Sequence, residues 1–99
     1  MQEKHNAQFF IEGFEFIPDR FWTTGVCVGN GCFCALGHLG TVIVNRPNKL
    51  SKEFFYILKN AGIARFNYEI NDGYNARYPQ PTPKARILAA LKDAKAKGY

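Results

Sequence analysis

The spacing of hydrophobic residues along the chain predicts three main helices. Apolar residues that recur every three or four positions fall on one face of a helix. This pattern is found from Glu3 to Glu12, from a cap at Ser51 to Ala61, and in a final helix that begins at Pro83. The side chains expected to be buried are Ala7, Phe10 and Ile11 in the first helix, Phe54, Phe55, Ile57, Leu58 and Ala61 in the second, and Ile87, Leu88, Leu91 and Ala94 in the third.

Residues at the ends of these stretches support the helix assignments. Thr82 is a favoured N-cap residue, and Pro83 suits the first position of the helix that follows it. Gly13, Gly62 and Gly98 stand where the three helices would end, and glycine is common just past a helix C-terminus. A further short helix is expected from Ala35 to Gly40.

A β-hairpin is predicted around Asn30-Gly31. Asn-Gly is the strongest two-residue hairpin signal, because both central positions of a type I′ turn need a positive φ. The β-prone residues from Val26 to Cys34 flank this dipeptide. The expected cross-strand pairs are Gly29 with Cys32, Val28 with Phe33, and Cys27 with Cys34.

A second strand-like stretch runs from Arg65 to Ile70, where Phe66, Tyr68 and Ile70 alternate with polar residues. Asn71-Asp72-Gly73 after it is a turn signal. Together these elements predict a single domain over residues 1–99. Its class is helix-dominated α+β, with three to four helices packed around a short β-hairpin.

Composition limits the class of protein. The chain has 99 residues, of which 46% are hydrophobic and 15% aromatic, so it can form a core without a metal or a disulfide. No apolar run approaches the roughly 18 residues of a membrane span. The N-terminus lacks the pattern of a signal peptide. We therefore expect a cytoplasmic protein with reduced cysteines, no membrane association and no cofactor.

The formal net charge of +5 is concentrated near the C-terminus. From Lys84 to Lys97 there are five basic residues and one acidic residue, so this segment carries most of the excess. Two interpretations are open. The basic residues can form a solvated face favoured by the helix dipole, or a patch for phosphates or an acidic partner. The first is favoured, because no recognition motif accompanies the segment.

The three cysteines and His38 allow three interpretations. A zinc site could use Cys27, Cys32, Cys34 and His38, although this spacing is tighter than in common zinc fingers. A cysteine-dependent enzyme could use Cys34 or Cys32 as nucleophile, with His38 as base and Asp72 as orienting group. The favoured interpretation is that the cysteines are small buried hydrophobic residues. His5 has no companion in the sequence that would make it a ligand.

The loop from Asn71 to Gln80 and the final helix are the expected contact surface. Tyrosine and arginine are typical anchors of protein interfaces. The residues predicted to bind a partner or ligand are Arg65, Asn71, Asp72, Tyr74, Arg77, Tyr78 and Lys84. Arg65, Arg77 and Lys84 would be the phosphate partners if the ligand is an anionic nucleotide.

Four short motifs are spread over most of the chain: Trp22-x-x-Gly25, Cys34-Ala35-Leu36-Gly37-His38-Leu39, Asn71-Asp72 and Ile87-Leu88-x-x-Leu91-x-x-Ala94. With these motifs the chain resembles a family of small uncharacterised proteins of bacteriophages and bacteria, known as a domain of unknown function. The resemblance implies a helical fold and a phage or mobile-element origin, and it implies no reaction. The sequence departs from the family at His38, where alanine is usual, which weakens a catalytic Cys–His pair as a family property.

These observations favour a binding protein over an enzyme. The predicted function is that of a small cytosolic, phage-encoded accessory protein that binds a host component. It would inhibit a defence or regulatory protein, or sequester an anionic nucleotide. The alternatives are a cysteine-dependent hydrolase or transferase that uses Cys34, and nucleic-acid binding through the basic C-terminal helix.

Overall fold

Four α-helices build the described part of the chain. They are α1 (Ala7–Glu15), α4 (Lys49–Asn60), α5 (Asn67–Asn71) and α6 (Pro83–Ala96). The short 3-10 helix η1 (Asp19–Phe21) follows α1. The computed structural model describes residues 5–24, 28–29, 32–33, 38, 49–65 and 67–99.

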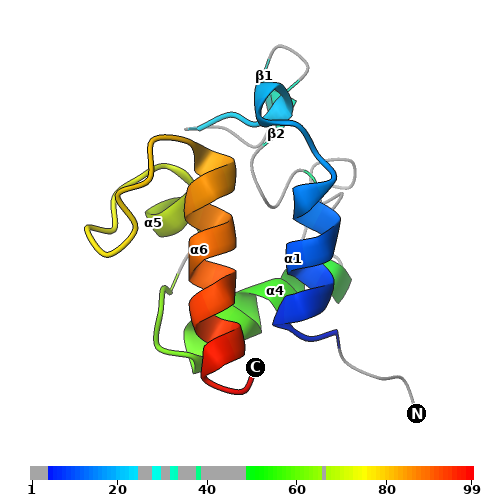
Figure 1. The fold of residues 1–99 in the computed structure, drawn as a ribbon, viewed down its shortest axis with the longest axis vertical. Helices are drawn as coiled ribbons and strands as arrows, with labels where there is room; N and C mark the ends of the chain where they lie inside the picture. The colour runs from blue at the N-terminus through cyan, green and yellow to red at the C-terminus, as the bar shows by residue number, and fades with distance from the viewer. Residues whose placement is uncertain (1–4, 25–27, 30–31, 34–37, 39–48, 66) are drawn as a thin grey trace.

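Helices α1 and α6 lie side by side and run antiparallel (Figure 1). At one end, the backbone N–H of Ala7 donates to the carbonyl of Tyr99 at 3.0 Å. At the other end, Nζ of Lys84 donates to the carbonyl of Glu15 at 3.0 Å. Helix α4 crosses this pair near the end where α6 finishes, and α5 packs against α6 (Figure 1).

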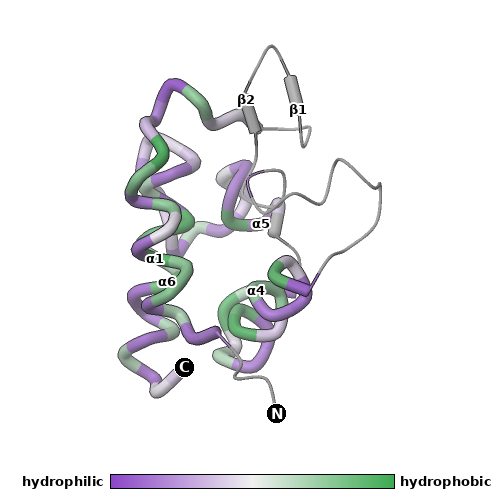
Figure 2. The backbone as a smooth tube through the Cα atoms, turned by 90° about the vertical axis from the view of Figure 1, so that its right-hand side faces the viewer, coloured by the Kyte–Doolittle hydropathy of each residue, from purple (hydrophilic) through white to green (hydrophobic). Residues whose placement is uncertain are grey.

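Aromatic rings form the part of the core between α1 and α4. The Phe54 ring lies 5.6 Å from both Phe10 and Phe14, measured between ring centroids. The Trp22 ring packs edge-on against Phe14 at 5.3 Å. Burying each phenylalanine contributes about 1.5–3 kcal/mol relative to exposure. Hydrophobic and hydrophilic residues alternate along α1, α4 and α6, as expected for helices with one buried face (Figure 2).

The apolar spacing identified the buried faces of the helices correctly. Ala7, Phe10 and Ile11 are buried in α1. In α4, Phe54, Ile57 and Leu58 are buried and Phe55 is half-buried, and Ala61 just beyond the helix is also buried. In α6, Ile87, Leu91 and Ala94 are buried, whereas Leu88 is partly buried.

The helix ends differ in part from the predicted ones. Thr82 caps α6 as expected, because its side chain accepts a hydrogen bond from the N–H of Ala85. Helix α1 starts later than predicted, at an Asn6 cap, and continues through Gly13 to Glu15. It continues because Phe14, one residue past the glycine, is buried in the core. Helix α4 begins at Lys49, so Ser51 is a buried residue of its first turn.

The predicted α+β class is wrong, because the fold is helical. Among the described residues, β1 (Val28–Gly29) and β2 (Cys32–Phe33) are only two residues each; Val28 lies opposite Phe33, and Gly29 opposite Cys32. Such short strands offer no sheet face that helices could cover, so the helices pack on one another rather than around a β-hairpin. The Asn30-Gly31 turn and the Cys27–Cys34 pair lie outside the described residues, as does the helix expected near Ala35.

The strand predicted from Arg65 to Ile70 is also wrong, because this region forms α5. A strand would place Tyr68 and Ile70 on one face, but Ile70 is fully inaccessible and Tyr68 is exposed. This difference is expected in a helix, where residues two apart point to different sides. A hydrogen bond from the backbone N–H of Arg65 to the carboxylate of Glu69, at 2.8 Å, supports the first turn. Hydrogen bonds from the distant Arg86 to the last two carbonyls support the C-terminal end of α5. A local sequence pattern cannot indicate contacts between residues so far apart.

Candidate functional site

Cations of the C-terminal segment bond to the C-terminal ends of the other three helices. Lys84 donates to the carbonyl of Glu15, the last residue of α1. Lys97 donates to the carbonyl of Ala61, one residue past α4, at 2.9 Å. Arg86 donates to the carbonyls of the last two residues of α5. The final carbonyls of a helix lack partners within it and carry partial negative charge, so each contact is favourable.

This arrangement gives much of the basic charge a structural role. The sequence favoured a solvated cationic face, but Lys84 is half-buried and Arg86 is buried. Lys95 also has a partner within the chain, since its Nζ donates to Oε1 of Gln8 at 2.6 Å. The charge of the segment is therefore not by itself a measure of its capacity to bind an anion.

Arg86 holds three main-chain carbonyls from a buried position. It is 8% exposed, and its guanidinium donates to the carbonyls of Ile70 at 3.1 Å, Asn71 at 2.8 Å and Gln80 at 2.8 Å. Gly73 lies against the guanidinium, because a Cβ there would be 3.4 Å from Cζ of Arg86. Gly73 also has a φ of +85°, a conformation that glycine adopts without strain.

Two of the predicted binding residues lie in the core. Asn71 is fully buried, and its Nδ2 donates to the carbonyl of Thr23 at 2.9 Å and to Oδ1 of Asp72 at 2.8 Å. Tyr78 is 3% exposed, and its hydroxyl donates to Oδ2 of Asp93 at 2.9 Å. Burial, followed by this hydrogen bond and the charge of Asp93, raises the pKa of Tyr78 to about 12. Both side chains hold the loop in place.

Other predicted binding residues lie on the surface. Tyr74 is 75% exposed, and its ring meets the ring of Tyr68 edge-on at 6.1 Å. A hydrogen bond from the N–H of Asn75 to the carbonyl of Glu69 brings the loop against α5 and so positions the two rings together. The exposed Arg65 lies just before α5, and the exposed Arg77 follows Tyr74 in the loop. We call Arg65, Tyr68, Tyr74 and Arg77 the tyrosine surface.

The structure leaves the cysteine hypotheses as predictions. Cys27 and Cys34 lie outside the described residues, and Cys32 belongs to β2. The His38 ring packs against Trp22 with centroids 4.7 Å apart. Asp72 is half-buried beside Asn71. Across the described residues there is no group of three or more His, Cys, Asp or Glu side chains that could hold a metal ion.

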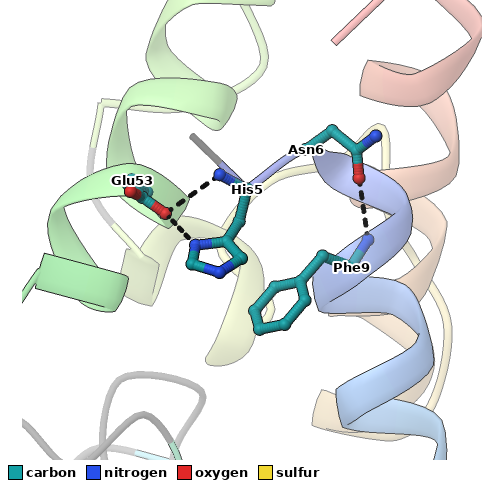
Figure 3. A network of polar contacts seen from close by, with 4 residues as sticks. All are labelled: His5, Asn6, Phe9 and Glu53. Atoms are coloured by element: carbon teal, nitrogen blue, oxygen red, sulfur yellow. Dashed lines mark hydrogen bonds and ion pairs between the residues drawn. The ribbon is translucent and has the colours of Figure 1, made fainter. Parts of the chain in front are cut away.

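A groove that the sequence did not reveal lies where the segment before α1 meets α4. His5 holds Glu53 of α4 through two hydrogen bonds, from Nδ1 at 2.5 Å and from the backbone N–H at 3.2 Å (Figure 3). The imidazole stacks on Phe9, with ring centroids 4.0 Å apart. We call this the His5 groove. Its volume is about 730 Å³, and Tyr56 of α4 and the C-terminal Tyr99 also line it.

Contacts from His5 govern the ionisation of Glu53. Burial alone would raise the pKa of this carboxyl, but the hydrogen bonds from His5 and the charges of His5 and Lys49 outweigh burial and lower it. Glu53 is therefore a carboxylate at neutral pH, already bonded to His5. His5 and Glu53 are 48 residues apart, so no sequence spacing could have indicated the pair.

The chain matches no protein-family model, no curated protein and no solved structure. The family resemblance therefore stays a prediction. Within the described ranges, every helix is too short or too polar to cross a membrane.

Proposed function

We propose that this protein acts by binding another protein through the tyrosine surface. The observation that carries the proposal is the exposed pair of rings, Tyr68 and Tyr74, packed edge-on with an exposed arginine near each in the chain. Tyrosine and arginine are, with tryptophan, the residues enriched among interface hot spots. The loop is held by buried contacts of Asn71 and Tyr78, so its exposed residues are presented with little loss of entropy on binding.

The partner would have carboxylates facing Arg65 and Arg77 and an apolar pocket for a tyrosine ring. The family resemblance is the reason to seek it in a bacterial cytoplasm, among defence or regulatory proteins that a phage protein would inhibit. The alternative in which the protein sequesters an anionic nucleotide loses one of its expected phosphate partners, because Lys84 donates to the carbonyl at the end of α1.

The test is affinity capture from bacterial lysate with the wild-type chain and the double variant Tyr74→Ala/Arg77→Ala. A captured protein is then purified and its affinity measured. Hot-spot residues contribute about 2 kcal/mol or more, so the double variant should bind at least about 30-fold more weakly. Tyr56→Ala is the control, because it removes another exposed tyrosine, from α4, outside the tyrosine surface. The proposal fails if no captured protein distinguishes the double variant from wild type.

A further inference from the structure

We propose that the His5 groove binds a small aromatic anion, a molecule with an aromatic ring and a phosphate, carboxylate or sulfonate group. This site is separate from the tyrosine surface, since the residues of that surface do not line the groove. Its volume of about 730 Å³ falls within the roughly 300–1,000 Å³ of small-molecule sites. The groove is formed by parts of the chain far apart in sequence, namely the segment before α1, helix α4 and Tyr99.

The charges that line the groove favour an anion. Lys49 and Lys52 of α4 contribute two positive charges. Glu53 is the only carboxylate side chain among the described residues lining the groove, and His5 already donates two hydrogen bonds to it. The ammonium groups of Lys49 and Lys52 are therefore the side-chain charges that an anionic ligand would meet beside the His5–Glu53 pair. Lys52 is exposed, so it can move toward a ligand without breaking the fold.

Aromatic rings next to these charges favour a ring on the ligand. Tyr56 is 55% exposed and Tyr99 is 42% exposed, and both line the groove. A ligand ring can pack on their faces, which is favourable beyond the area buried. The backbone carbonyl of Tyr99 accepts the N–H of Ala7, which fixes this wall to the start of α1. A ring and an anionic group on one molecule would use both features.

The experiment follows backbone amide chemical shifts by NMR during titration with adenosine monophosphate and with naphthalene-2-sulfonate. Neutral adenosine is the matched ligand control. We expect at least one anion to saturate with a Kd below about 1 mM, with shifts centred on α4, Asn6 and Tyr99. Adenosine should bind more weakly than its monophosphate.

Two substitutions test the site. Lys52→Glu should weaken binding of the anion about tenfold, because it reverses a charge in the groove. Tyr56→Ala should also weaken binding, because it removes a ring face. Lys92→Glu is the matched control, since it makes the same charge change on α6 at a residue that does not line the groove. Thermal unfolding and unchanged shifts away from the groove establish that each variant is folded.

The proposal is overturned if neither anion saturates below that Kd, or if Lys92→Glu weakens binding as much as Lys52→Glu. It is also overturned if the shifts centre elsewhere. Tyr74→Ala/Arg77→Ala should leave anion binding unchanged, so a failure of this proposal and a failure of the proposed protein-binding function are distinguishable.

Discussion

Replacing Arg86 by alanine should lower the free energy of unfolding by about 4 kcal/mol. The wild-type guanidinium donates three hydrogen bonds to main-chain carbonyls while it is 8% exposed. A hydrogen bond to a charged group contributes about 1.5–3 kcal/mol. Simple addition overstates the total, because bonds from one group are not independent and water can reach the truncated site.

The measurement is urea unfolding followed by circular dichroism, with the midpoint and the slope fitted separately. Lys92→Ala is the control on the same helix, and this exposed position should change the free energy by less than about 0.5 kcal/mol. The free energy of unfolding of Arg86→Lys should lie between those of Arg86→Ala and Lys92→Ala, because one ammonium cannot reproduce the planar fork of the guanidinium. A loss below about 1 kcal/mol for Arg86→Ala would refute the structural role that we assign to these bonds.

Three further predictions concern the other polar contacts. Tyr78→Phe should lower the free energy of unfolding by about 1 kcal/mol near neutral pH, because it removes the hydrogen bond to Asp93. The raised pKa of the wild-type phenol means that this stabilisation is complete below pH 10.0 and is lost as the pH rises toward about 12. Equal alkaline unfolding of the two proteins would contradict this prediction. The lowered pKa of Glu53 should stabilise the fold above pH 4.5, with loss as pH falls through the folded value. Acid titration of Glu53→Gln should therefore show a shallower decline than wild type, and identical curves would count against the His5 contact. Asn6→Ala should lower the free energy of unfolding, measured by heat or urea, by about 1 kcal/mol because it removes the N-cap of α1. Asn6→Ser should retain most of the stability, because serine is also a favoured cap.

The sequence predicted those parts of the fold that depend on local physics. Thr82, Pro83 and the apolar spacing after them are sufficient to specify α6, because capping and helix periodicity act within a few residues. Alternation failed for α5: Phe66, Tyr68 and Ile70 suggested one face of a strand, but Ile70 is buried and Tyr68 is exposed. The last two carbonyls of that short helix accept hydrogen bonds from Arg86, which belongs to a segment that the local pattern could not include.

In the candidate sites, too, local features were predicted and contacts between distant residues were not. Tyr74 and Arg77 were predicted from residue type in a turn-rich loop, and they are exposed. Asn71 has an equally polar side chain, yet it is buried because the carbonyl of Thr23, 48 residues earlier, accepts its amide. The His5 groove was not predicted, since its walls meet only in the folded chain.

The bonds from α6 to the other helices have a consequence for how the molecule opens. Lys84, Arg86 and Lys97 complete the ends of α1, α5 and α4, so detaching α6 leaves three sets of carbonyls without these partners at once. Opening of one helix alone is then disfavoured, and the described helices should behave as one cooperative unit. In hydrogen exchange, the amides in the last turns of α1 and α4 should report the same opening free energy as those in the centre of α6.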